Sequence, residues 1–237
     1  MKRVGKRAGV LAAALAATLG AALPARAQLE EDFQTWNRLT LRGSFAGGPR
    51  WGIEIEGRLR QGSRELGQFL IRPYVTLRSS PQFAVNLGFA NFLNWPSGAG
   101  DVTVETRLFQ DFTYAFDVER LTINQRIRLE ERWIPNADAV SLRARYRLQL
   151  QHPLDGERRW LINLSDELIY NLNTPGGAGP PGGFEQNRVI LSFIHRFTPQ
   201  LSFELGYQGN YFERPAPRAD QFNHNLLIYF TYDFDGR

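Results

Sequence analysis

Arginine and glutamate alternate with apolar residues in several stretches of this chain. Residues 126–132 read RIRLEER, and residues 143–149 read RARYRLQ. Side chains on a β-strand point alternately to its two faces, so each stretch would gather its charges on one face. A guanidinium stays charged at physiological pH and binds carboxylate or phosphate through a planar pair of N–H donors. The spacing therefore indicates either anion binding or a dense set of internal ion pairs.

The same alternation, followed along the chain, predicts a charged face that is rich in arginine. Sixteen arginines share this face: Arg38, Arg42, Arg58, Arg60, Arg72, Arg78, Arg107, Arg120, Arg126, Arg128, Arg132, Arg143, Arg145, Arg147, Arg188 and Arg196. Eight acids share it: Glu54, Glu56, Glu105, Asp111, Glu130, Glu167, Glu204 and Asp233. The excess is therefore eight positive charges. The candidates for lining a lumen and binding anions are Arg58, Arg60, Arg126, Arg128, Arg143, Arg145, Arg147, Arg188, Glu54, Glu56, Glu130 and Glu167.

These residues need β-strands to position them, and the period-2 pattern predicts such strands along the chain. The eleven alternating segments are about 33–45, 51–61, 67–79, 82–94, 102–116, 119–133, 139–151, 159–171, 185–197, 200–213 and 222–234. Beyond the N-terminal region we find no helical periodicity, linker or second domain. The pattern predicts one all-β domain.

Three features favour a membrane barrel with its apolar face outward. The segments run to about a dozen residues, whereas globular strands average ~5–6 residues and lipid-crossing strands need ~9–11. Tight turns alternate with looser connections, as on the two rims of such barrels. Four tryptophans lie on the apolar face at segment ends, as in an aromatic girdle: Trp51, Trp95, Trp133 and Trp160. A soluble two-sheet sandwich is the alternative.

The strand count needs a further assumption, because bacterial single-chain barrels usually have an even number of strands. Eleven segments are an odd number. We therefore predict a transmembrane antiparallel up-and-down barrel of about twelve strands, with a second crossing hidden around Gln34–Phe45. Ten strands is the alternative, if one segment does not cross.

The first 27 residues have the features of a cleaved secretory signal. Four basic residues precede an apolar stretch at 8–23, and Ala25-Arg26-Ala27 fits a cleavage site. The barrel domain would then be 28–237, with 23 arginines against 24 acids, although the whole chain carries +4. Net charge therefore gives no support to nucleic-acid binding. The chain has no cysteine, which excludes disulfides and thiolate metal sites.

Five stretches occur in a distinctive order: NQRIRLEERW (124–133), LRARYRLQLQHPL (142–154), LSDELIYN (164–171), QNRVILSF (186–193) and LSFELGYQ (201–208). With them the chain resembles the predicted outer-membrane barrels of domain-of-unknown-function family 2490, over nearly all of residues 28–237. The resemblance implies a barrel in the bacterial outer membrane, with no established activity. The chain departs from the family at its end, where Asp235-Gly236-Arg237 follow Phe234, whereas members often finish on an aromatic residue.

One stretch breaks the alternation. In Ser165-Asp166-Glu167, the parity of the neighbours places Asp166 on the apolar face. We expect a β-bulge that turns both acids inward. A functional carboxylate pair and a protein contact on the outer wall are the alternatives. His195 and His224 fall on the apolar face near segment ends, where we expect them to have structural roles at the membrane interface.

Three functional hypotheses follow. The first is a small outer-membrane channel with an anion-leaning lumen that admits a small anionic solute. The second is a structural or lipid-interacting barrel that is plugged by its own ion pairs. The third is a lipid-modifying enzyme using Ser165, Asp166 or Glu167. We expect no catalytic residues, metal or cofactor. The expected partners are outer-membrane lipids, the barrel-assembly machinery and periplasmic chaperones, and no nucleic acid.

Overall fold

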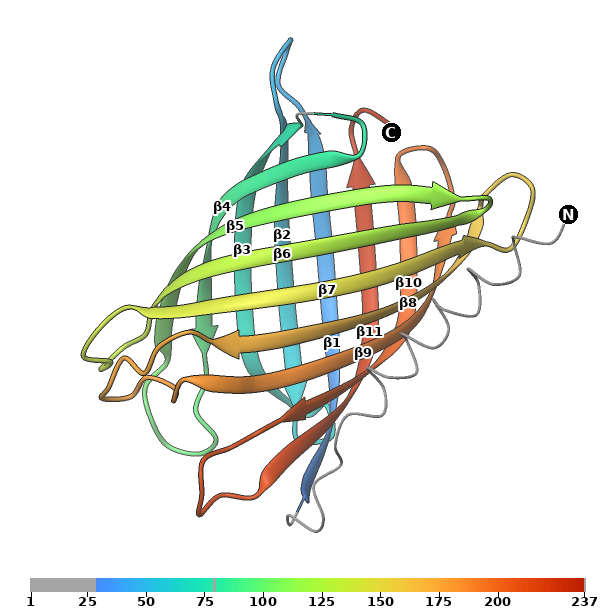
Figure 1. Ribbon diagram of the computed structural model, residues 1–237. Helices are drawn as coiled ribbons and strands as arrows, with labels where there is room; N and C mark the ends of the chain where they lie inside the picture. Colours follow the sequence, from blue (N-terminus) through green and yellow to red (C-terminus); the bar gives the residue numbers. More distant parts are fainter. Residues whose placement is uncertain (1–28, 79, 237) are drawn as a thin grey trace, which may run out of the picture.

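The computed structural model describes residues 29–78 and 80–236, and in this part of the chain eleven β-strands form one closed barrel (Figure 1). The strands are β1 (Leu29–Ser44), β2 (Arg50–Arg60), β3 (Glu65–Arg78), β4 (Phe83–Asn94), β5 (Thr103–Val118), β6 (Leu121–Trp133), β7 (Ser141–Pro153), β8 (Trp160–Asn171), β9 (Gly183–Arg196), β10 (Leu201–Phe212) and β11 (Asp220–Asp233). Each predicted segment coincides with one strand. The all-β barrel is therefore confirmed, and the sandwich alternative is wrong.

Consecutive strands pair antiparallel, but the barrel closes through a parallel pair, β1 and β11. The predicted count of twelve is wrong, as is the alternative of ten. The region around Gln34–Phe45 hides no second crossing, because β1 runs unbroken for 16 residues and pairs with both β2 and β11. With an odd number of strands, the first and last point the same way, so the closing pair has to be parallel. Consequently β1 begins at one rim of the barrel and β11 ends at the other.

The side chains alternate between an apolar outer wall and a polar interior. In β6, Ile127 and Leu129 are 50% and 40% exposed. Arg128 and Glu130, which alternate with them along the strand, are each only 3% exposed. A water-soluble fold has the opposite arrangement, with apolar residues inside and charges outside. The apolar face predicted from parity is thus the outer face of the barrel.

The two rims differ in their connections. One rim, which we call the long-loop rim, carries the connections 61–64, 95–102, 134–140, 172–182 and 213–219. The other, the short-loop rim, carries 45–49, 79–82, 119–120, 154–159 and 197–200. The looser connections predicted from the sequence all lie on the long-loop rim.

Two long loops pack against each other at that rim. Ala178 donates its backbone N–H to the carbonyl oxygen of Asn136 at 2.8 Å. Gly177 has φ +52°, and a Cβ added there would lie 2.2 Å from the same oxygen. Only glycine fits this position, because a side chain would clash with the backbone of the neighbouring loop. The loops 134–140 and 172–182 are therefore held together over the end of β6–β9.

The four predicted girdle tryptophans lie at both rims. Trp51 and Trp160 stand at the starts of β2 and β8 on the short-loop side. Trp133 ends β6 and Trp95 follows β4 on the long-loop side. Trp133 and Trp160 are 43% and 48% exposed on the outer wall.

The predicted signal segment 1–27 lies outside the described residues. Among the residues that are described, no helix has the length and apolar character required to cross a bilayer.

Candidate functional site

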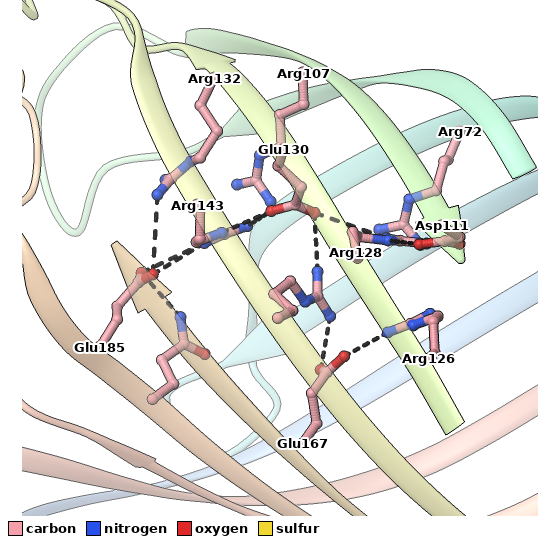
Figure 2. A network of polar contacts seen from close by, with 12 residues as sticks. Arg72, Arg107, Asp111, Arg126, Arg128, Glu130, Arg132, Arg143, Glu167 and Glu185 are labelled. Carbon is pink, nitrogen blue, oxygen red and sulfur yellow. Dashed lines mark hydrogen bonds and ion pairs between the residues drawn. The ribbon is translucent and has the colours of Figure 1, made fainter. Parts of the chain in front are cut away.

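The lumen contains a connected network of arginines and carboxylates, drawn in Figure 2, and Glu130 of β6 lies at its centre. Arg143 of β7 donates from Nε to Glu130 Oε2 at 2.6 Å, and Arg145 donates from Nη1 to Glu130 Oε1 at 3.0 Å. Arg128 Nη1 lies 3.7 Å from Oε1. Three guanidinium groups therefore surround one buried carboxylate.

A second carboxylate, Glu167 of β8, continues the network toward the short-loop rim. Arg145 donates from Nη2 to Glu167 Oε2 at 2.7 Å and so bridges Glu130 and Glu167. Arg126 forms a very short ion pair with the other oxygen of Glu167. Arg188 Nη1 of β9 lies 3.5 Å from Oε2. Glu167 is thus also shared by three arginines.

Arginine–carboxylate pairs extend around the wall on β5 and β6. Arg128 binds Asp111 in a two-point contact, with distances of 2.5 Å from Nε and 2.8 Å from Nη2. Glu105 accepts from Arg107 Nε at 2.6 Å and from Arg132 Nε at 2.7 Å. Planar contacts of this kind hold the guanidinium in one orientation as well as neutralising it.

A smaller group lies on β1–β3. Glu56 of β2 is 1% exposed and accepts 2.5 Å hydrogen bonds from Arg38 Nε and Arg58 Nε. Arg72 Nη1 lies 2.5 Å from Glu54 Oε2. Each of these acids forms an ion pair with an arginine from its own or a neighbouring strand. Opposite charges that face each other across strands stabilise a sheet.

Aromatic rings inside the barrel stack against several of these arginines. The Arg58 and Arg188 guanidinium carbons lie 3.7 Å and 5.5 Å from the ring centre of Trp36, and Arg38 lies 3.9 Å from that of Tyr229. Arg107 lies 3.6 Å over Phe92. Such contacts stabilise a cation that has left water. Trp36, the fifth tryptophan, is not a girdle residue but a part of the lumen.

Amides and hydroxyls make up much of the lumen wall on β8–β11, beside the charged side chains of Glu167, Glu185, Arg188 and Glu204. A chain of hydrogen bonds runs from Gln149 through Asn163 and Ser192 to Glu204, with distances of 2.7, 2.9 and 2.5 Å. Beyond it lie Gln208, Asn210, Asn223 and Asn225, all almost fully buried. Apart from Arg188 of β9, the arginines of the ionic network lie on β1–β7.

All twelve residues predicted to line the lumen lie inside the barrel. The wider set of sixteen arginines is less uniform. Arg120 and Arg196 are exposed at the short-loop rim, and the side chain of Arg78 is not among those described. Arg147 is enclosed in the lumen between Arg126 and Glu167, yet among the described residues it has no hydrogen bond or ion pair within 4 Å.

Glu185 belongs to the network, although parity did not identify it. It lies 3.2 Å from Arg143 and 3.9 Å from Arg132. The pairing of β8 with β9 skips one residue: Tyr170 faces Phe184 and Ile169 faces Gln186. Glu185 is the extra residue of this bulge, so it and Gln186 both turn inward. The sequence offered one hint of this role, the position of Glu185 three residues before Arg188. Strict alternation, however, assigns Glu185 to the outer face.

The bulge that we expected at Ser165–Glu167 is absent. β8 pairs in unbroken register with β7 from Leu161 to Asn171, and with β9 through Asp166 and Glu167. Ser165 and Glu167 therefore face the lumen, while Asp166 remains on the outer wall and accepts a 2.6 Å hydrogen bond from Asn187 Nδ2. Because this hydrogen bond satisfies the carboxylate on the outer wall, Asp166 can stay there without a β-bulge. The wall of the barrel separates Asp166 from the other two residues.

Polar groups also meet on the outer wall at two histidines. His195 stacks on Trp160, with ring centres 4.0 Å apart, at the short-loop rim. His224 Nδ1 lies 2.7 Å from the Tyr207 hydroxyl, nearer the long-loop rim. Both contacts fit the structural roles expected for these residues. No group of three His, Asp or Glu that could hold a metal ion occurs in the described residues.

A cavity of about 310 Å³ opens from the network toward the long-loop rim. Its wall includes Arg58, Arg60, Arg107, Arg132, Arg143, Arg188, Glu105, Glu185 and Trp36, with Gln34, Gln68, Gln186 and Asn223 between them. A second cavity, of about 500 Å³, lies at the short-loop rim beside Arg42, Arg196 and Asp233. Between the two stands the network of Glu130 and Glu167.

Comparison with known proteins identifies the family. The model of a family described as "Protein of unknown function (DUF2490)" matches residues 33–223, which include nearly the whole barrel. The chain belongs to this family. This DUF2490 barrel is also similar to an uncharacterised protein of Methylorubrum extorquens, with 26% identity over 187 residues that cover 77% of this chain and 81% of the relative. No solved structure matches.

Proposed function

We propose that this DUF2490 barrel is inserted in the bacterial outer membrane and that ion pairs close its lumen, so that it does not act as an open porin. Three observations support the membrane location: an apolar outer wall, tryptophans at both rims and unequal connections at the two ends. Export by the segment 1–27 is part of the same proposal.

The observation that carries the closure is the burial of charge inside the barrel. Arg128, Glu130, Arg143 and Asp111 are each 3% exposed, which leaves almost no surface for water inside the barrel around them. An ion crossing the lumen would have to displace these paired groups. Breaking one buried ion pair costs about 3–5 kcal/mol. A lumen held by several such pairs therefore presents a high barrier to small ions.

Two measurements test the proposal. After cell fractionation, we expect the protein in the outer-membrane pellet, released by detergent but not by high salt. Recovery as a water-soluble protein would overturn the membrane location. For the refolded protein in planar bilayers, we expect no steady conductance above the bare membrane. Regular conductance steps would overturn the closure.

The second candidate function is an anion-selective channel, and the charge imbalance of the lumen favours it. The arginines outnumber the acids, and Arg147 has no ion pair among the described groups. If the network rearranges and ions pass, the remaining positive charge would favour anions. A reversal potential that shows anion preference under a salt gradient would support this function. A preference for cations would contradict it.

A further inference from the structure

We propose that the cavity at the long-loop rim is a binding site for a small anion that carries a carboxylate or phosphate together with hydroxyl groups. The proposal rests on the composition of the cavity wall. It does not require the lumen to conduct, because the cavity opens at the rim above the closed network.

The first argument is an excess of positive charge at the cavity. Six arginines line it, against Glu105 and Glu185. Acids outside the cavity wall neutralise some of this charge: Arg58 forms an ion pair with Glu56, and Arg143 forms one with Glu130. The remaining arginines are poorly compensated. Arg107 and Arg132 share the carboxylate of Glu105, and Glu185 lies a further 3.9 Å from Arg132.

Arg60 and Arg188 are the least compensated of the six. Within 29–78 and 80–236, the only acid within 4 Å of Arg60 is Glu65, which is half exposed and 3.9 Å away. Arg188 lies 3.5 Å from Glu167, a carboxylate that already binds Arg126 and Arg145 at shorter range. An anion placed between these two side chains would supply the charge that the protein itself does not.

The second argument is the supply of unused donors that are already enclosed. Arg60 Nε and Arg132 Nη1 are buried from water and make no hydrogen bond. A buried donor without a partner costs about 1–3 kcal/mol, so a ligand that accepts these hydrogen bonds recovers that free energy. Arginine is suited to this role because its planar fork matches carboxylate and phosphate oxygens.

The third argument concerns shape and the rest of the ligand. A volume of about 310 Å³ lies at the lower end of the range for small-molecule pockets. Four amide side chains stand among the arginines: Gln34, Gln68, Gln186 and Asn223. Amides donate and accept hydrogen bonds, so they can satisfy the hydroxyl groups of a sugar acid or sugar phosphate. The guanidinium carbons of Arg58 and Arg188 lie 3.7 Å and 5.5 Å from the centre of the Trp36 ring, which helps to hold both arginines at the cavity wall.

Calorimetric titration of the refolded full-length protein tests the site. The probes are glucuronate, glucose 6-phosphate, inorganic phosphate and, as the neutral control, glucose. We expect one or both sugar anions to bind in a salt-sensitive manner and glucose not to bind. The carboxylate and phosphate probes distinguish the two possible anionic groups. Inorganic phosphate binding as tightly as glucose 6-phosphate would overturn the role given to the amides.

The matched variants are Arg60→Gln with Arg188→Gln, and Arg120→Gln as the control. The first pair removes two cavity arginines, and we expect it to weaken binding of the sugar anion by at least about tenfold. Arg120 is exposed at the short-loop rim and does not line the cavity, so its variant should bind as the wild type does. Equal loss in the control would overturn the site. The wild-type protein alone also tests the proposal. If neither sugar anion bound at about 10 mM, the proposal would be wrong, whatever the variants showed.

Discussion

Arg143 of β7 donates a hydrogen bond to Glu185 of β9 at 3.2 Å, although β8 lies between these two strands. The contact is possible because a bulge turns Glu185 into the lumen, where the long arginine side chain reaches it across one strand. Arg143 thereby connects Glu130 and Glu185, and with them β6, β7 and β9. The ionic network thus joins strands that no backbone ladder joins.

Replacing Glu130 should weaken the barrel strongly. Glu130→Gln leaves Arg143 and Arg145 without the carboxylate that they share, in a part of the lumen that water hardly reaches. We expect the free energy of unfolding to fall by about 3–5 kcal/mol. Urea titration in detergent, followed by the mobility shift of the folded barrel on gels, measures it.

Glu131→Gln is the control for this prediction, since Glu131 lies next in the chain but points to the other face of β6. It should change stability by less than about 1 kcal/mol. If both variants behaved alike, the assigned role of the network would be wrong.

Two neighbouring arginines of β7 should respond in opposite ways. Arg145 bridges Glu130 and Glu167, so Arg145→Gln breaks two buried ion pairs. We expect the free energy of unfolding to fall by about 3–5 kcal/mol. Arg147 faces another cation, Arg126, across the strands and makes no ion pair with any residue that the structure describes. Arg147→Gln removes this repulsion and should leave stability unchanged or raise it. Thermal unfolding of the two variants side by side tests the contrast, and equal destabilisation would argue against it.

Asp166 should be dispensable for assembly. Its carboxylate lies on the apolar outer wall, with Asn187 as its hydrogen-bond partner. An acid facing lipid at mid-strand is unfavourable, by less than the ~2–4 kcal/mol of an arginine or lysine there. Asp166→Asn keeps a polar contact with Asn187 and removes the charge. We therefore expect equal or higher thermal stability and normal membrane levels. A marked loss of either would show that the carboxylate makes a contact outside this chain.

The rims should face opposite sides of the membrane, with the long loops outside the cell. The chain has no cysteine, so one introduced cysteine reports on one position. Ser97 lies exposed in the connection 95–102, and Gly156 lies exposed in the connection 154–159, where a Cβ would meet no atom within 4 Å. In intact cells, a membrane-impermeant maleimide should label Ser97→Cys but not Gly156→Cys. After permeabilisation it should label both. The reverse pattern would invert the topology and place the anion cavity on the periplasmic side.

The amino-acid sequence by itself determined the strands and their faces. Alternation is a local property: once Arg126, Arg128 and Glu130 lie on one parity and Ile127 and Leu129 on the other, any extended conformation separates them. The tryptophans at segment ends and the unequal connections likewise follow from order along the chain. For this reason the eleven segments, the polar interior and the apolar outer wall were predicted from the pattern.

Only the tertiary structure decided the strand count, the bulge and the partners of each charge. Closure by the parallel pair of β1 and β11 depends on how the two ends of the sheet meet, which no local pattern records. The position of Glu185 and Asp166 depends on the register of β8 against β9, which long-range hydrogen bonds fix. Whether sixteen arginines line an open path or pair with acids depends on distances across the barrel. Those distances are set by its closed shape, and they place Glu130 and Glu167 where each is shared by three arginines.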